Sequence, residues 1–215
     1  VSLTFVGADQ PIPAADVIIL PGSKSTASDL AWLKRQGWDN AIQRHLRYGG
    51  KVLGICGGFQ MLGEWVDDPD GLEGQPGKVA GLGLLPLTTR MVRGKQLRSV
   101  SGVLVGETAT VTGYEIHNGV SEGPALSRPL FDINGRPEGS VSDDGQIIGT
   151  YLHGLFDHPE ACHELLKQLG LADGEQNDYQ AHRERELDRL ADMLEAQVDI
   201  EAVIGLIDAG ALPSR

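Results

Sequence analysis

The 215-residue sequence predicts an α/β fold with a mostly parallel sheet, helices on both faces and an insertion of antiparallel strands. Short apolar runs at Asp16–Leu20 and Val52–Ile55 are typical of strands that are buried on both faces. A helical pattern at Asp29–Tyr48 lies between these runs and would pack on the sheet. Between Gly81 and Val120 the runs become short, rich in Val and Thr and separated by glycine, which indicates antiparallel strands.

The composition is that of an ordinary globular chain. Hydrophobic residues make up 40% and charged residues 22% of the sequence. The length suits a single α/β domain, for which we expect a core at about 1–170 and a C-terminal helical segment at about 171–215. Because the chain begins without methionine, we expect a piece of a longer protein or a trimmed chain.

Charge and cysteine content argue against several classes of partner. A net charge of −12 offers no basic stripe that could neutralise phosphates, so nucleic acid is not an expected partner. Two cysteines, Cys56 and Cys162, are too few for a disulfide framework and favour a reducing compartment. No apolar run approaches the ~20 residues of a membrane span, and no signal segment opens the sequence. We therefore expect a cytoplasmic location and no membrane partner.

The first elements lead to a glycine turn. Leu3–Val6 is a short strand candidate, and the buried run at Asp16–Leu20 ends at the turn Pro21–Ser25. Gly22 lets the backbone turn sharply and aim an N–H group at a ligand, although the same residues suit a plain turn between strand and helix. The helical pattern that follows is interrupted by Gly37, which predicts one broken helix or two short ones.

Cys56 is the central feature of the sequence, because it stands between a buried strand and a helical segment that extends to about Val66. A reactive side chain followed by glycines at a strand-to-helix turn is typical of a nucleophile elbow. The helix N-terminus would lower the pKa of the thiol, and the backbone N–H groups of Gly57 and Gly22 would hold an oxyanion. The alternative is a buried structural cysteine beside a glycine turn.

The later strands lead to a histidine. Asp67–Gly77 is predicted as a loop, and short strands are predicted at Leu82–Leu85, Thr88–Val92, Arg98–Leu104 and Thr108–Thr112. Two further strands, Leu130–Ile133 and Gly139–Val141, are predicted to form a hairpin. The last core strand, Gln146–Leu152, ends at His153. Since the ends of parallel strands share one sheet edge, His153 is predicted to meet Cys56 and act as its base. The alternative is a capping or core histidine.

Three further polar residues are candidates for binding substrate. Glu115 and His117 stand two apart on a predicted strand and therefore point to the same face. They suit either a binding site or an exposed, salt-bridged strand face. Gln60 lies one helical turn past Cys56, where its amide can hydrogen-bond an amino-acid substrate.

The C-terminal region is predicted to be helical at Pro159–Leu169, Asp178–Gln197 and Asp199–Ile207, with solvated charged faces. Cys162 lies in a helical pattern and is expected to be inert packing. No metal site is assigned, because metal-ligand spacing is missing at the remaining histidines, His45, His158, His163 and His182.

These motifs together resemble a known family. The segment G-I-C-G-G-F-Q-M-L-G around Cys56 resembles the nucleophile motif of class I, triad-type glutamine amidotransferases. Three more segments are similar to the cobyric acid synthase branch of that family: L-P-G-S-K-S-T-A-S-D-L at Leu20–Leu30, G-Y-E-I-H-N-G at Gly113–Gly119 and G-T-Y-L-H-G-L-F-D at Gly149–Asp157. The resemblance covers roughly residues 1–170.

The resemblance implies a flavodoxin-like class I glutamine amidotransferase fold and hydrolysis of glutamine to glutamate and ammonia, with Cys56 as nucleophile and His153 as base. It implies an N-terminal ATP-dependent synthetase domain as partner, which amidates carboxylates of the corrin adenosylcobyrinic acid a,c-diamide. No G-x-x-x-x-G-K-[ST] phosphate loop occurs in this sequence, so that domain is absent from this chain. ATP and Mg²⁺ would be used there, and no cofactor is expected in this domain.

Leu155 departs from the wider superfamily, which has a glutamate two residues after the histidine. The cobyric acid synthase branch shares this departure. The site therefore runs as a Cys–His dyad, or another acid orients His153, with Asp157 and Glu115 as candidates.

Three other functions are weighed. One is a glutaminase subunit of a peptidoglycan-precursor amidating complex with a Mur-ligase-like partner. The others are a redox-active cysteine protein of the same superfamily, against which Gln60 argues, and a module that only docks partners. The P-G-S-K-S turn and the Y-L-H-G-L-F segment favour the cobalamin pathway.

Overall fold

The structure, a computed structural model, describes residues 1–171 and 179–208, and the chain divides into two compact units, residues 1–176 and 177–215. A central sheet in the first unit is formed by β1 (Val17–Leu20), β2 (Lys51–Ile55), β10 (Ile147–Thr150) and β9 (Ser140–Val141), in that spatial order. β1, β2 and β10 are parallel, and β9 adds an antiparallel edge. The α/β class predicted from the sequence is confirmed.

Two apolar cores cover the two faces of this sheet. Successive residues of a strand point to opposite faces, so Val52 packs into one core and Leu53 into the other. The first core holds the apolar sides of three helices, α1 (Thr26–Arg35), α2 (Trp38–Arg47) and α3 (Gly57–Leu62). The second core holds α4 (Pro159–Gln168) together with strands of the antiparallel insertion.

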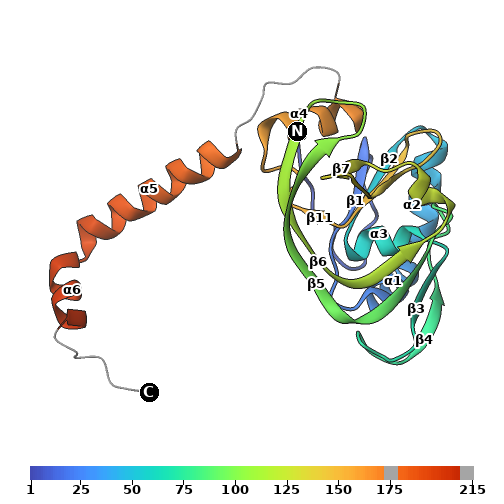
Figure 1. Cartoon of the computed structure of the whole chain (residues 1–215), viewed down its shortest axis with the longest axis horizontal. Helices are drawn as coiled ribbons and strands as arrows, with labels where there is room; N and C mark the ends of the chain where they lie inside the picture. The colour runs from blue at the N-terminus through green and yellow to red at the C-terminus, as the bar shows by residue number, and fades with distance from the viewer. Residues whose placement is uncertain (172–178, 209–215) are drawn as a thin grey trace. The chain divides into compact units, whose positions relative to one another are not determined.

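The insertion forms a second sheet of its own. Its strands are β3 (Trp65–Asp68), β4 (Gly77–Ala80), β5 (Thr88–Leu104), β6 (Thr110–Glu122), β7 (Phe131–Ile133), β8 (Arg136–Glu138) and β11 (Leu152–His153), and a short 3-10 turn (Pro124–Ser127) follows β6. Figure 1 shows β5 and β6 as two long, curved strands that run side by side. β6 pairs with β5 along one edge and with the short β11 along the other.

The structure corrects the strand expected at Leu3–Val6, which forms no regular element. Leu3 is 65% and Phe5 is 87% exposed, so these side chains do not pack in the core. An apolar run makes a strand only where a neighbouring strand can accept its hydrogen bonds.

The predicted helix to Val66 and the predicted strand Leu82–Leu85 are both wrong. The helix α3 ends at Leu62, and Trp65 opens β3, which pairs with β4. These two strands flank the predicted loop and take in its first two residues and its last one. The backbone N–H groups of Leu82, Leu84 and Leu85 instead donate to the carbonyl oxygens of Met61 and Leu62. This apolar run therefore satisfies the free carbonyl groups at the end of α3.

Between Gly81 and Val120 the strands are fewer and longer than predicted. The runs at Thr88–Val92 and Arg98–Leu104 belong to the single strand β5, and Thr108–Thr112 overlaps the start of β6. The predicted hairpin of Leu130–Ile133 with Gly139–Val141 is also wrong, because β7 pairs with β8. β9 leaves that sheet and pairs with β10 instead.

The predicted core strand Gln146–Leu152 is broken. β10 ends at Thr150, and after Tyr151 the chain enters the second sheet as β11. His153 therefore lies on β11, opposite Tyr114 of β6, and not at the end of a central parallel strand.

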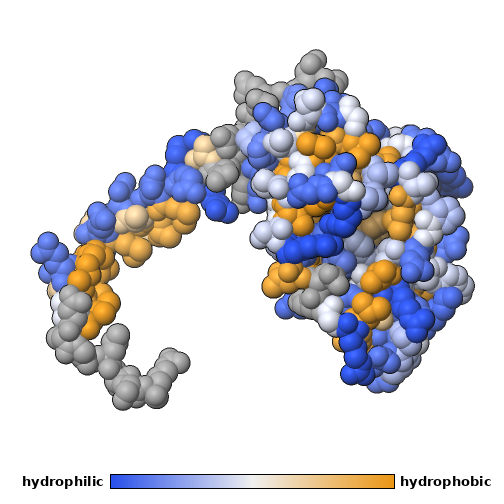
Figure 2. Space-filling model, viewed as in Figure 1, coloured by the Kyte–Doolittle hydropathy of each residue, from blue (hydrophilic) through white to orange (hydrophobic). Residues whose placement is uncertain are grey.

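The described part of the second unit, residues 179–208, forms two helices, α5 (Tyr179–Gln197) and α6 (Ile200–Asp208). They correspond to the two predicted helices, except that Asp178 lies outside the described residues. Apolar side chains gather along one side of α5, including Leu187, Leu190, Met193 and Leu194 (Figure 2). Within the described ranges, no helix combines the length and the apolar character needed to cross a membrane. The predicted division into one domain with a helical segment stays a prediction.

Candidate active site

Cys56 forms the elbow predicted from the sequence. It joins β2 to α3 with φ 53° and ψ −108°, a backbone conformation that is rare for a residue with a side chain. Its N–H donates to the carbonyl oxygen of Thr150 at 2.8 Å, which ties the elbow to β10. The side chain is 7% exposed, and Sγ lies 3.5 Å from the carbonyl oxygen of Ile116 on β6.

The glycines after Cys56 allow α3 to approach the β1 turn closely. A Cβ atom on Gly58 would lie 2.0 Å from the carbonyl oxygen of Leu20, and one on Gly57 would lie 2.7 Å from the backbone nitrogen of Ser23. Only residues without a side chain fit against backbone atoms at these distances. The turn that carries Gly22 is thereby held against the elbow.

Gly22 marks the point where the predicted catalytic groups meet. A Cβ atom placed on Gly22 would lie 3.5 Å from Cε1 of His153 and 3.8 Å from Cβ of Cys56. Cys56, His153 and the Gly22 turn therefore surround one small space, although they come from three separate stretches of the chain. The backbone N–H groups of Gly57 and Gly22 stay our predicted oxyanion donors.

His153 is oriented by stacking. Its ring lies parallel to that of Tyr114, with centroids 5.0 Å apart and planes 6° from parallel. Nε2 is buried and makes no hydrogen bond to the described residues. Burial lowers the pKa of His153 below its ordinary value, so the imidazole is neutral at pH 7 and able to accept a proton.

Neither acid proposed to orient His153 is placed to do so. Glu115 pairs across the strands with Leu152, so its side chain lies on the opposite face of the sheet from that of His153. Its carboxylate is bound by two arginines, and Asp157 is an exposed residue whose N–H donates to the carbonyl oxygen of Gly154. Leu155, at the position of the superfamily glutamate, is buried in the second core.

Gln60 lies in an internal hydrogen-bond network. Its Oε1 accepts from the Thr26 hydroxyl at 2.8 Å, and its Nε2 donates to the Tyr151 hydroxyl at 3.4 Å. Burial raises the pKa of Tyr151 to about 12, so this phenol stays protonated. Gln60 is 2% exposed, and in this arrangement its amide holds α1, α3 and Tyr151 together. A direct contact of Gln60 with substrate stays a prediction.

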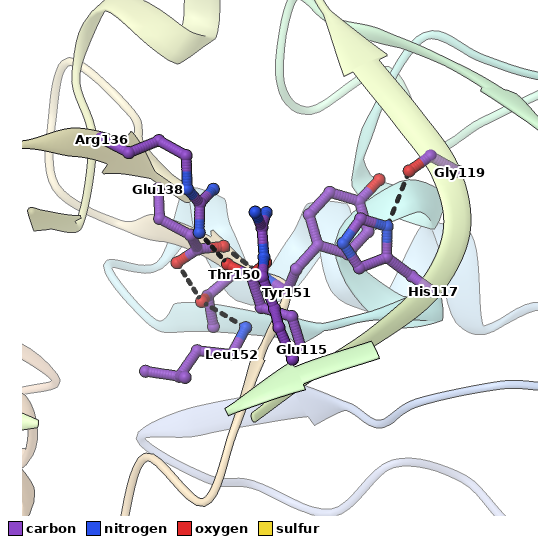
Figure 3. A network of polar contacts seen from close by, with 9 residues as sticks. Glu115, His117, Gly119, Arg136, Glu138, Thr150, Tyr151 and Leu152 are labelled. Carbon is purple, nitrogen blue, oxygen red and sulfur yellow. Dashed lines mark hydrogen bonds and ion pairs between the residues drawn. The ribbon is translucent and has the colours of Figure 1, made fainter. Parts of the chain in front are cut away.

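Glu138 is a residue that the sequence did not single out. Its carboxylate accepts from the Thr150 hydroxyl and from the N–H of Tyr151, both at 2.6 Å (Figure 3). The Thr150 hydroxyl in turn accepts from the N–H of Leu152 at 3.0 Å. Glu138 therefore holds the kink between β10 and β11. Its two partners stand three and two residues before His153.

The pH dependence of stability provides a test of Glu138. Burial raises its pKa from 4.5 to about 7, so the folded chain binds more protons than the unfolded chain between these values. The free energy of unfolding should therefore fall as pH rises through this window, by on the order of 3 kcal/mol relative to Glu138→Gln. Urea unfolding of both proteins at pH 5 and pH 8 measures this difference. Parallel pH profiles for the two proteins would contradict the assignment.

Glu115 and His117 line one cavity, consistent with the shared face that their spacing predicted. The cavity measures about 390 Å³ and also contacts Arg98, Arg136 and Tyr151. The His117 ring stacks on Tyr151 with centroids 3.8 Å apart, and its Nδ1 lies 2.7 Å from the carbonyl oxygen of Gly119 (Figure 3). Burial lowers the pKa of His117, so this ring is also neutral at pH 7. Glu115 is fully buried, which excludes the exposed strand face considered above.

Within residues 1–171 and 179–208, no group of three or more His, Cys, Asp or Glu side chains is placed to hold a metal ion. Cys162 is half-buried on α4, and burial raises the pKa of its thiol, with a further contribution from Asp157. The thiol is thus protonated and poorly nucleophilic at pH 7.

The fold and the elbow together define a class of protein. A parallel sheet with a strained cysteine at the strand-to-helix turn, and a histidine beside it, is the arrangement of class I glutamine amidotransferases. The chain belongs to the CobB/CobQ-like glutamine amidotransferase domain family, whose model matches residues 1–161. The resemblance noted in the sequence is thereby confirmed, and the chain is an enzyme of the glutamine amidotransferase class. Domains of this class generally act with a partner synthetase domain or subunit.

Solved structures share the fold. One described as a glutamine amidotransferase is 17% identical, with a TM-score of 0.53 over 73% of this chain and 80% of that chain. The structure of PurLQS from Thermotoga maritima is 18% identical, with a TM-score of 0.54 over 77% of this chain and 84% of that chain. At such low sequence identity these similarities establish the fold but not the substrate or the partner.

Proposed function

We propose that this chain is the glutaminase domain that supplies ammonia for the ATP-dependent amidation of adenosylcobyrinic acid a,c-diamide to cobyric acid. The observation that carries the glutaminase activity is the meeting of Cys56, His153 and Gly22 around one small space. The corrin substrate and the cobalamin pathway rest on the sequence segments at Leu20–Leu30 and Gly149–Asp157.

The reaction follows from the groups at the elbow. His153 takes the thiol proton of Cys56, and the thiolate attacks the side-chain amide carbon of glutamine. The N–H groups of Gly57 and Gly22 hold the tetrahedral oxyanion. His153 returns the proton to the leaving nitrogen, which departs as ammonia, and water then hydrolyses the thioester to release glutamate. Cys56 and His153 work here as a dyad, with the stacked Tyr114 ring and the Glu138-braced kink fixing the imidazole.

The partner that receives the ammonia is an N-terminal synthetase domain of the same protein, which binds the corrin. ATP and Mg²⁺ act in that domain, and this chain uses no cofactor. We expect a cytoplasmic enzyme.

Labelling of the nucleophile tests the glutaminase assignment. The glutamine analogue 6-diazo-5-oxonorleucine should alkylate Cys56, because it occupies the glutamine site with an electrophile next to the sulfur. Peptide mass spectrometry locates the label, and an excess of glutamine should protect against it. Label on Cys162, or no label when the synthetase domain is also supplied, would refute the assignment.

Reconstitution with a partner tests the pathway. Addition of a corrin-amidating synthetase domain should restore glutamine-dependent amidation, whereas a Mur-ligase-like partner should not. The opposite result would assign the chain to a peptidoglycan-precursor amidating complex. Peroxide-sensitive Cys56 without any glutamine turnover would instead indicate a redox protein.

A further inference from the structure

The loop between β3 and β4 is held in one shape by a buried carboxylate. Asp68, the last residue of β3, is 5% exposed, and its two oxygens accept the N–H groups of Leu72 and Glu73 at 2.8 and 2.9 Å. The N–H of Gly71 donates to the carbonyl oxygen of Asp68 at 3.3 Å. An aspartate is buried in this way only where such partners satisfy it. The backbone at Glu73 is therefore fixed relative to β3.

Glu73 reaches from this loop to the start of α1. Its carboxylate accepts the N–H of Thr26, the first residue of α1, at 2.9 Å, and its carbonyl oxygen accepts from the Ser25 hydroxyl at 3.0 Å. Ser25 stands at the N-cap position, but its side chain makes no capping hydrogen bond. The cap of α1 therefore comes from a residue 47 positions along the chain, and not from the N-cap residue that usually supplies it.

The residues that Glu73 holds complete the turn that carries Gly22. Ser25 and Thr26 follow Gly22 by three and four positions, and the Ser23 hydroxyl accepts the N–H of Ser25 at 3.0 Å within the turn. At the start of the turn, the close packing of α3 on Ser23 leaves no room for a side chain on Gly57. The turn is therefore fixed by α3 at its start and by Glu73 at its end.

The position of Gly22 matters because its N–H is a predicted oxyanion donor. A Cβ atom on Gly22 would lie 3.8 Å from Cβ of Cys56, so the turn stands directly beside the reacting sulfur. A donor stabilises an oxyanion only when it points at the place where the charge develops. A shift of about 1 Å in such a group can cost on the order of 10²-fold in rate. The contacts that fix the turn therefore bear on catalysis as well as on stability.

We propose that Glu73 is a positioning residue of the glutaminase reaction, which holds the Pro21–Ser25 turn so that the Gly22 N–H points at the oxyanion. The proposal rests on the glutaminase function proposed above. Glu73 acts through Ser25 and Thr26 and not on the substrate, and Asp68 supports it by fixing the loop.

Glu73→Ala tests the proposal through two reactions of the same sulfur. In glutamine turnover, with the synthetase domain supplied, kcat should fall at least ~10-fold and KM should stay within about 3-fold, because the donor acts on the transition state. Alkylation of Cys56 by iodoacetamide should stay within about 2-fold of wild type, because this reaction forms an S–C bond with loss of iodide and develops no oxyanion. A purely structural defect would not separate the two rates.

Asp70→Ala is the matched control. Asp70 lies in the same loop, forms an exposed ion pair with Arg93 and should match wild type in both reactions when replaced. Glu73→Gln keeps an oxygen that can accept the N–H of Thr26, so its kcat should stay within about 3-fold of wild type.

Hydrogen exchange shows whether the turn itself loosens. Backbone amides in residues 21–26, followed by mass spectrometry, should exchange faster in Glu73→Ala than in wild type or Asp70→Ala. If Glu73→Ala fails to fold by circular dichroism, Glu73→Asp decides the question, because its side chain is one methylene shorter and should show the same pattern of rates and exchange.

The outcomes separate the positioning of the turn from the glutaminase assignment. Wild-type turnover of glutamine together with an unchanged kcat in Glu73→Ala would overturn the positioning and leave the glutaminase standing. Equal losses of turnover and alkylation, or equal losses in Glu73→Ala and Asp70→Ala, would assign Glu73 to general stability and also overturn the proposal. Wild-type protein that neither turns over glutamine nor reacts with the glutamine analogue would refute the glutaminase and, with it, any contribution of Glu73 to that reaction.

Discussion

Cys56→Ser is expected to abolish glutamine-dependent ammonia production, with a fall in kcat of at least ~10³-fold. The serine hydroxyl fits the elbow, so the fold is retained, but an alcohol beside the neutral His153 is a far weaker nucleophile than a thiolate. In the complete protein, amidation driven by added ammonia should continue, because the synthetase reaction does not pass through Cys56. Glutamate release and ammonia-driven amidation are measured on the same preparation.

Cys162→Ser is the control for this experiment. Cys162 lies on α4, and burial holds its thiol in the protonated form, so its replacement should leave glutamine turnover at the wild-type rate. Loss of activity in Cys162→Ser, or retained activity in Cys56→Ser, would contradict the assignment of the nucleophile.

Gly58→Ala is expected to disrupt the elbow through a single methyl group. The added Cβ would lie 2.0 Å from the carbonyl oxygen and 2.6 Å from the carbonyl carbon of Leu20, so α3 would have to move away from β1. We expect a loss of roughly 3 kcal/mol in the free energy of unfolding, together with loss of glutaminase activity, since the same movement displaces the Gly22 turn. Urea unfolding measures the stability, provided that the m-value is unchanged.

Gly74→Ala makes the same chemical change where nothing lies within 4 Å of the added methyl group. Its stability should stay within about 1 kcal/mol of wild type. A Gly58→Ala protein as stable and active as Gly74→Ala would show that the close approach of α3 to β1 is not needed for the site.

Much of the site could be predicted because its signals are local. The elbow requires a reactive residue followed by glycines between a strand and a helix, and all of these lie within Val52–Leu62. His153 and Gly22 each follow a buried strand in the sequence, and the structure brings both beside Cys56. The spacing of Glu115 and His117 placed them on one face for the same local reason.

The residues that sequence reasoning missed depend on pairing between distant strands. Tyr114 reaches His153 because β6 pairs with β11, and Arg98 reaches Glu115 because β5 pairs with β6 in one register. Glu138 reaches Thr150 from β8, which belongs to the other sheet. Tyr114 could have been found from its place beside Glu115 in the quoted segment, but Glu138 and the arginines carry no such signal.

The amino-acid sequence by itself determined the α/β class, the cysteine elbow and the family, because strand periodicity and a turn among glycines are properties of neighbouring residues. Tertiary structure alone decided that the last strand breaks at Tyr151, that β11 carries His153, and that Glu115 is buried between two arginines. The physical reason is that the segment packed against a strand sets where the strand ends, and the same is true of the partner of a buried carboxylate. A single sequence does not show which distant segments pack together.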